Sequence, residues 1–305
     1  MRMNFPAPRS LRYTALIALA ISSAACSRSS ENTLNRDTSP ASSPAAIEEK
    51  TPSEALSIHE KKKMQQEELM GAIFQNGYQA EQGRALAEIG DIQGGTSKYS
   101  MTIVSNADLE DGRTIVVVNG VPIDDDGNEQ YSHASPGFLN VYFLERDGRR
   151  WRLVERRENI ATMGSNGRIG SITWVMLAPH KPGFIVSTGG TWHGNTIRIA
   201  EIYDVANGVV GLGSLKEYFD NVGSCMEDTE ECWRVESTLQ FVDGERPSFY
   251  RDIHIEFSSS KFTIAIDKDG AVTERTKVKV KDVARYRFDG VQYKLIAGAN
   301  PVADL

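Results

Sequence analysis

The stretch that decides the fold is Phe138–Arg157, in which two apolar runs flank one turn. The first run is Phe138–Glu145, the turn is Arg146-Asp147-Gly148-Arg149, and the second run is Arg150–Arg157. An Asp-Gly pair between two such runs is the strongest short-range signal of a β-hairpin. The stretch therefore predicts two antiparallel strands joined by a tight turn.

The first run of this hairpin is apolar on both of its sides. Successive residues of a strand point to opposite faces of the sheet. Leu139, Val141 and Phe143 thus fall on one face, and Phe138, Tyr142 and Leu144 fall on the other. A strand with two apolar faces is covered on both, so we expect this one in the centre of a sheet or sandwich.

Further turn signals follow the same pattern from Lys98 onward and divide the chain into short apolar runs. Nine signals in about 200 residues predict ten or more strands, arranged as an antiparallel meander, a sandwich or a propeller-like array. The pairs are Asp111-Gly112, Asn119-Gly120, Asp126-Gly127, Asp147-Gly148, Asn166-Gly167, Asn207-Gly208, Asp243-Gly244, Asp269-Gly270 and Asp289-Gly290. The expected strands beyond the hairpin are Thr114–Val118, Ser171–Leu177, Gly183–Ser187, Thr196–Tyr203, Val209–Ser214, Arg234–Val242, Asp252–Phe257, Phe262–Ile266, Thr276–Val280, Arg285–Phe288 and Val291–Leu295.

Helical patterns precede the β-rich part. Ser53 to about Gln75 predicts a helix, because Leu69 and Ile73 repeat at the helical spacing of four residues. Gln79–Ile89 predicts a second short helix. The expected fold class is mainly β, with a short helical segment at residues 54–97 and a β-rich domain at residues 98–305.

The first 25 residues have the layout of a secretory signal. Arg2, Arg9 and Arg12 form a basic start, and a short apolar run is followed by small residues. The apolar run is shorter than the roughly 20 residues that a membrane-spanning helix needs. The signal therefore predicts export of the chain.

The end of the signal, Ser23-Ala24-Ala25-Cys26, resembles a bacterial lipobox. In that motif the Cys becomes the lipidated first residue of the mature protein, although Ser23 stands where the motif usually has Leu. The resemblance implies that Cys26 carries a lipid anchor and that the membrane is a partner. Ser27 replaces the Asp that marks retention in the inner membrane, so the resemblance favours the outer membrane, with the protein facing the periplasm. The alternative is an ordinary cleaved signal that ends near Ala25.

Residues 26–53 are rich in Ser, Thr, Pro, Ala and charge, and they contain few large apolar side chains. Such a composition cannot bury enough apolar surface to offset the entropy of ordering, so we expect a tether between the lipidated Cys and the folded part.

The charge balance bears on the partners of the protein. The 305 residues carry a net charge of −7, and the first 25 contain three Arg and no acid, so the mature chain carries −10. An acidic chain is a poor binder of nucleic acid and suits a basic protein partner.

Two cysteines remain after Cys26, at Cys225 and Cys232. An even pair in an oxidising compartment predicts a disulfide, which in the chain-entropy model contributes about 2.5 kcal/mol for a loop of this length. The bond closes an acidic loop, residues 226–231, in which Glu227, Asp228, Glu230 and Glu231 lie. The loop is either a solvated turn or a preordered surface that recognises a partner.

A second candidate binding region is Gly189-Gly190-Thr191-Trp192-His193-Gly194-Asn195. Trp192 and His193 offer stacking and proton transfer, so this is a candidate ligand loop, with an ordinary turn as the alternative. Asp124-Asp125-Asp126 lacks the Gly and Glu positions of an EF-hand, which favours a charged turn over a calcium site. Gly164, Gly167 and Gly170 match no phosphate loop and indicate turns.

No established catalytic motif and no metal-ligand spacing occurs in the sequence, so we assign no catalytic residue, no metal ligand and no cofactor. The expected function is that of a lipid-anchored periplasmic β-rich binding or structural protein that is not an enzyme. One alternative is an inhibitor or immunity lipoprotein directed against a basic cell-wall hydrolase. Another is an envelope hydrolase with a site near Trp192 and His193, because a triad assembled in three dimensions leaves no sequence motif.

Overall fold

The computed structural model describes residues 58–90, 95–225, 231–244, 249–266, 268–269 and 272–303. The signal, Cys26 and the tether lie outside the described residues, as do Glu227, Asp228 and Glu230. Within the described part of the chain, no helix is both long and apolar enough to cross a bilayer.

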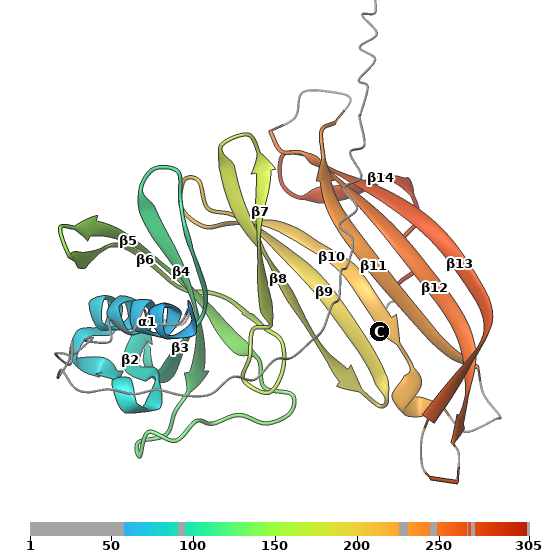
Figure 1. The fold of residues 1–305 in the computed structure, drawn as a ribbon, viewed down its shortest axis with the longest axis horizontal. Coiled ribbons are helices and arrows are strands. Elements are labelled where there is room, and N and C mark those ends of the chain that lie inside the picture. The colour runs from blue at the N-terminus through green and yellow to red at the C-terminus, as the bar shows by residue number, and fades with distance from the viewer. Residues whose placement is uncertain are drawn as a thin grey trace, which may run out of the picture. The chain divides into compact units, whose positions relative to one another are not determined.

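The N-terminal elements are one α-helix and a sheet of six strands (Figure 1). They are α1 (Ile58–Phe74), β1 (Tyr78–Gln79), β2 (Arg84–Gly90), β3 (Thr96–Asp108), β4 (Arg113–Pro122), β5 (Gly137–Asp147) and β6 (Arg150–Met163). The following elements form a sheet of eight strands. They are β7 (Ser171–Ala178), β8 (Lys181–Trp192), β9 (Asn195–Asp204), β10 (Val210–Asp220), β11 (Cys232–Val242), β12 (Asp252–Ile266), β13 (Val272–Phe288) and β14 (Tyr293–Gly298).

Both sheets are antiparallel meanders, because every strand pairs with its neighbours in the sequence. The spatial order is β1 to β6 in the first sheet and β14 back to β7 in the second. The prediction of a mainly β fold with antiparallel meander topology and a helical N-terminal segment is confirmed. The hairpin at Phe138–Arg157 is the β5–β6 pair, in which Asp147 lies opposite Arg150.

The two faces of β5 contact two different cores, as its pattern predicts. Tyr142 and Leu144 pack with the C-terminal half of α1 on one face of the sheet. Val141 and Phe143 pack on the other face with Phe184 and other residues of the second sheet. The centre of the first sheet is therefore covered by the helix on one side and by the second sheet on the other.

The helix α1 uses the apolar residues of its last turns for this contact. Leu69 and Ile73 are fully buried, and Met70 is nearly so. The ring of Phe74 meets Tyr142 edge to face at 5.3 Å between centroids. The first turns of the helix, which contain Lys61 and Lys62, are exposed. The apolar face predicted for the last turns of the helix is therefore the face that packs against the first sheet.

The second sheet has a further core on the face that does not contact the first sheet. Val235, Ile255 and Phe257 belong to this core, and Val302, from the segment that follows β14, packs into it. The segment after β14 is held by Asn300, whose Nδ2 donates to the carbonyl of Lys216 at 2.9 Å. Lys216 Nζ in turn donates to the carbonyl of Val302 at 3.0 Å.

The prediction of a second helix at Gln79–Ile89 is wrong. The chain forms a short 3₁₀ helix at Ala80–Gln82 and then the strand β2. Ala85 and Ile89 are buried in the first sheet's core, and this spacing of four satisfies a strand as well as a helix. The pairing of β2 with β3 decides between the two.

Two details of the strand predictions are also wrong. Asn119-Gly120 is not a turn, because it lies inside β4, where Asn119 pairs with both Thr102 and Leu139. The runs expected as separate strands after Asp252 and after Thr276 are continuous parts of β12 and β13. One register shift, between Lys261 and Phe262, interrupts the pairing of those two strands without ending either.

A buried carboxylate, Asp252, is bound by two arginines where β12 meets β13. Its side chain is fully buried and accepts bonds from Arg285 Nε at 3.0 Å and from Arg287 Nη2 at 2.8 Å. The hydrogen bond from Arg287 is the main reason that the pKa of Asp252 lies below its usual value, with the charges of both arginines adding to it. A carboxylate with a lowered pKa stabilises the fold while it is ionised.

We expect Asp252→Asn to lower the free energy of unfolding by about 2 kcal/mol at pH 7, because hydrogen bonds to charged groups contribute about that much. Since the folded pKa lies below the unfolded value of about 3.9, this contribution is present above that pH and is lost as the pH falls through the folded pKa. Urea unfolding at pH 7 and pH 3 should show the difference between wild type and variant shrinking in acid.

The matched control is Asp243→Asn, because Asp243 also binds an arginine, Arg251 Nε at 2.9 Å, but its side chain is 84% exposed. Exposed pairs contribute little to stability. An Asp252→Asn variant as stable as this control at pH 7 would contradict the assignment.

Candidate functional site

The segment that joins the two sheets, residues 164–170, is the centre of the candidate site. It is held by Asn119, whose side chain is only 6% exposed in the middle of β4. Asn119 Nδ2 donates to the carbonyl of Gly167 at 2.8 Å, and its Oδ1 accepts from the backbone N–H of Ile169 at 3.0 Å. The buried side chain of Ile169 reaches the core between the sheets. One polar side chain thus fixes the path of this segment, which we call the linker.

The connection between β4 and β5 lies against the same linker. The backbone N–H of Gly167 donates to the carbonyl of Ser135 at 2.9 Å. Tyr131 packs over Gly167 so closely that a Cβ on that glycine would lie 3.2 Å from the ring. His133 Nε2 donates to the carbonyl of Thr191 at 2.9 Å, which joins this connection to the β8–β9 hairpin.

These segments enclose a cleft of about 580 Å³, which we call the linker cleft. Its walls are the linker, the end of β8 and the start of β9, and they are built largely of glycine backbone and short polar side chains. The lining residues are Tyr131, Gly164, Ser165, Asn166, Arg168, Gly170, Ser187, Thr188, Gly189, Gly190, Thr196, Ile197 and Arg198. A second cleft of about 430 Å³ is lined by the linker together with residues of β3 and β4, and it shares Tyr131, Asn166, Arg168 and Gly170 with the first.

Most hydroxyl groups in the linker cleft have a protein partner. Ser187 Oγ donates to Glu217 Oε1 at 2.8 Å, and Ser165 Oγ donates to the carbonyl of Gly189 at 3.2 Å. Thr196 Oγ1 shares a hydrogen bond with Thr191 Oγ1 at 2.9 Å.

Thr188 is the exception among them, because its Oγ1 is buried and has no hydrogen-bond partner among the described residues. A buried polar group without a partner costs about 1–3 kcal/mol, and native structures contain few of them. Thr188 is among the residues that line the linker cleft and is 7% exposed, but its Oγ1 atom is itself shielded from solvent.

The linker cleft is positively charged within an acidic protein. Arg198 Nε donates to Glu217 Oε1 at 3.1 Å, so these two charges offset each other. Arg168 is exposed at the cleft and makes no ion pair within the described residues. A guanidinium in a cleft that also offers hydroxyl and amide groups suits an anionic, polar ligand.

The predicted ligand loop lies next to this cleft rather than inside it. Trp192 ends β8 and folds its ring over Gly190, which lines the cleft. His193 forms the exposed turn after Trp192, with a positive φ of 49°. Within the described residues, the imidazole of His193 makes no hydrogen bond or ion pair, and the structure does not bring it to a nucleophile or carboxylate. Neither Thr188 nor Arg168 was identified from the sequence as a candidate site residue. The spacing of Gly164, Gly167 and Gly170, which predicted turns, was the one sequence signal in the linker.

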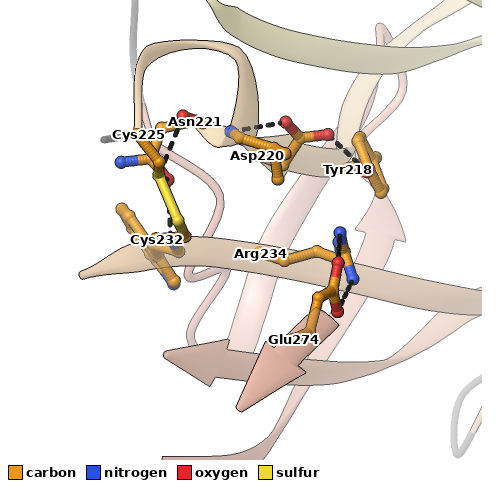
Figure 2. A network of polar contacts seen from close by, with 9 residues as sticks. Tyr218, Asp220, Asn221, Cys225, Cys232, Arg234 and Glu274 are labelled. Carbon is orange, nitrogen blue, oxygen red and sulfur yellow. Dashed lines mark hydrogen bonds and ion pairs between the residues drawn. A yellow bond between two sulfur atoms is a disulfide. The ribbon is translucent and has the colours of Figure 1, made fainter. Parts of the chain in front are cut away.

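The predicted disulfide between Cys225 and Cys232 is confirmed, with 5.7 Å between the two Cα atoms (Figure 2). Of the acidic loop, only Glu231 is described. Its carboxylate lies 3.5 Å from Lys261 Nζ and 3.7 Å from Lys277 Nζ. This carboxylate is therefore already balanced by the protein's own lysines.

A network of polar side chains lies beside the disulfide and connects β10, β11 and β13 (Figure 2). Arg234 holds both carboxylate oxygens of Glu274, at 3.0 and 2.8 Å, and this contact lowers the pKa of Glu274. Tyr218 donates its hydroxyl to Asp220 Oδ2 at 2.5 Å. Asn221 Oδ1 accepts from the backbone N–H of Trp233 at 2.6 Å. These contacts brace the strands around the disulfide, and we assign them a structural role.

The acidic turn at Asp124-Asp125-Asp126 is also accounted for by contacts within the protein. Asp124 accepts bonds from the backbone N–H groups of Asp126 and Asn128, and from Gln130 Nε2. These donors occupy the oxygens that a cation would need. Within the described ranges, no group of three or more His, Cys, Asp or Glu side chains is arranged to hold a metal ion.

No family model matches the chain, and searches of curated proteins and of solved structures found no match. The functional argument therefore rests on the residues and their geometry.

The burial of Thr188 predicts an unusual response to mutation. We expect Thr188→Val to leave the free energy of unfolding unchanged or to raise it by about 1 kcal/mol, because it removes an unsatisfied buried hydroxyl and keeps the side-chain shape. The matched control is Thr114→Val. Thr114 is equally buried but donates to Asp108 Oδ1 at 2.5 Å, so its loss should cost about 1–3 kcal/mol. Urea unfolding compares the two, and an equal loss in both variants would show that Thr188 has a partner.

Proposed function

We propose that the protein is a lipid-anchored, non-enzymatic binding protein of the bacterial cell envelope, and that its ligand site is the linker cleft. The buried hydroxyl of Thr188 is the observation that carries this proposal. Thr188 lines a cleft in which the hydroxyl groups of the serines and of Thr196 are paired, so a ligand that displaces the cover of Oγ1 and bonds to it recovers a hydrogen bond that the described residues alone do not supply.

The chemistry of the walls supports a small ligand that carries hydroxyl groups and one anionic group. Arg168 supplies a charge that is not balanced within the described residues, and Arg198 has terminal nitrogens beyond the Nε that Glu217 binds. Hydroxyl and amide side chains can both donate to and accept from sugar-like hydroxyl groups. Tyr131 offers an aromatic surface at the rim. A sugar acid or a sugar phosphate combines these features.

Anchoring and location rest on the sequence. The basic start, the short apolar run and the small residues before Cys26 support a lipidated N-terminus, and Ser27 favours the outer membrane facing the periplasm. The linker cleft would then meet small solutes of the periplasm at the end of a tether.

The two alternative functions stay predictions, because no contact in the described residues favours either. An inhibitor or immunity role against a basic hydrolase would use the acidic loop, of which Glu231 is paired with the protein's own lysines. A hydrolase site near Trp192 and His193 would need a nucleophile or a carboxylate beside that imidazole.

We expect Cys26→Ser to move the protein from the detergent phase to the soluble periplasmic fraction without changing its fold, since the anchor belongs to the tether and not to the sheets. Phase partitioning with Triton X-114 and a circular dichroism spectrum measure the two properties. Continued membrane partitioning of the variant would contradict lipidation at Cys26.

We expect glucuronate or a sugar phosphate to bind the purified protein in isothermal titration calorimetry, and neutral glucose to bind at least tenfold more weakly, because a charge-assisted bond to an arginine is worth about that ratio. Thr188→Val and Arg168→Gln should each weaken binding at least tenfold. Thr188→Val would then lose ligand affinity without losing stability, which separates binding from folding.

The matched control for Arg168→Gln is Arg149→Gln, because Arg149 is exposed in the turn between β5 and β6, away from the cleft. Equal binding of glucose and glucuronate would contradict the claim that the cleft recognises an anionic group on its ligand. Absence of binding across a panel of sugar acids and sugar phosphates would contradict the ligand class itself.

A further inference from the structure

The strand β13 extends well beyond its neighbour β14. On one side, β12 accompanies β13 from Val272 to Tyr286. On the other side, β14 pairs only with Ala284 through Phe288, and the following Ala299 adds one bond to the carbonyl of Val283. Among the described strands, residues 273–282 of β13 therefore have a neighbour on one side only. We call this segment the β13 edge, and its outward backbone groups are free to pair with another strand.

The two faces of the β13 edge differ in chemistry. Val278 and Val280 lie opposite Lys261 and Ser259 of β12, whereas Lys279 and Lys281 lie opposite Ser260 and Ser258. Because successive residues of a strand alternate between faces, the valines share one face and the two lysines share the other.

The valine face continues the apolar core of the second sheet. Val235 lies opposite Ser259, in the same cross-strand row as Val280, and is fully buried. At the edge of the sheet, Val278 and Val280 remain 50% and 47% exposed. The core thus extends to the edge and ends with two uncovered aliphatic side chains.

The lysine face is prepared for carboxylates. Lys279 and Lys281 are exposed, and they make no ion pair within the described residues. One carboxylate already binds a basic group on this face, because Arg234, which lies opposite Ser260 in the cross-strand row of Lys279, binds Glu274. A second copy of this chain would place lysine beside lysine, and like charges on neighbouring strands are destabilising.

We propose that the β13 edge binds an extended segment of a partner protein in which aliphatic and acidic residues alternate. The segment adds a strand beside β13, and the backbone hydrogen bonds of the new pair supply affinity. Its aliphatic side chains cover Val278 and Val280 on one face, while its acidic side chains meet Lys279 and Lys281 on the other. Lysines on an uncovered edge also disfavour pairing with a second copy of the same strand. The same two lysines therefore disfavour self-association and favour a partner strand that carries acidic residues.

The test uses the full chain purified in detergent and two fluorescent nine-residue peptides of equal composition. In the first peptide Val and Glu alternate, and in the second the Val and Glu residues are grouped in two blocks. Fluorescence anisotropy should show saturable binding of the alternating peptide and at least tenfold weaker binding of the block peptide, since only alternation matches both faces at once. Equal binding of the two peptides would overturn the proposal.

Charge reversal on the protein gives the second arm of the test. Lys279→Glu with Lys281→Glu should weaken binding of the alternating Val–Glu peptide at least tenfold and should create binding of the matching Val–Lys peptide. The control is Lys61→Glu with Lys62→Glu on the exposed turns of α1, which should change neither affinity.

Three further results would overturn the proposal. One is unchanged affinity of the Val–Glu peptide in the edge variant, and another is failure of the Val–Lys peptide to bind a folded edge variant. The third is a concentration-dependent dimer of the wild-type chain that disappears in the edge variant, because the occupant of the edge would then be a second copy.

Discussion

One side chain, Asn119, controls how the two sheets are connected and therefore where the linker cleft forms. It satisfies a buried carbonyl at Gly167 and a buried N–H at Ile169 at the same time. Each hydrogen bond contributes only about 1 kcal/mol, but its loss would leave buried polar groups without partners at a further cost. The linker therefore follows a single path across β4. Tyr131, Arg168 and Thr188 keep their places around the cleft because that path is fixed.

A second constraint shapes the other edge of the eight-stranded sheet. After β14, the chain does not continue beside β13 but turns toward β10, where Asn300 and Lys216 exchange hydrogen bonds with the backbone. Val302 then packs into the core of the sheet. The sheet gains a covered core at the C-terminus, and β14 consequently ends after six residues while β13 continues for seventeen. The uncovered β13 edge is thus a result of where the C-terminal segment finds its apolar contacts.

Structural features that depend on residues close together in the sequence were predicted correctly. Features that depend on contacts between residues far apart in the sequence were not. The β5–β6 hairpin and the two apolar faces of β5 follow from local alternation and one Asp-Gly pair. The Asn119-Gly120 pair looks the same locally, yet its amide binds residues 48 and 50 positions away, and no local rule detects that. The helix expected at Gln79–Ile89 fails for a similar reason, since pairing with β3 outweighs a helical preference of a few tenths of a kcal/mol per residue. Near the candidate site, Trp192 could be singled out from the sequence because it is an aromatic residue in a glycine-rich stretch. Thr188 gave no signal, because only its burial against the linker makes it unusual.

Each of the two proposed surfaces includes a buried hydroxyl group that has no hydrogen-bond partner within the described residues. Five buried polar side-chain atoms lack a hydrogen-bond partner within the described residues. One is Thr188 Oγ1 in the linker cleft, and another is Ser259 Oγ, which lies opposite Val280 of the β13 edge. An unpaired buried hydroxyl lowers stability, and valine at position 188 or alanine at position 259 would remove that cost with little change in side-chain shape. A fold that depended on stability alone would gain from both replacements. Hydroxyl groups at these two positions, one lining a cleft and the other beside a bare edge, are what is expected if each surface is completed by a ligand or a partner rather than by the chain itself.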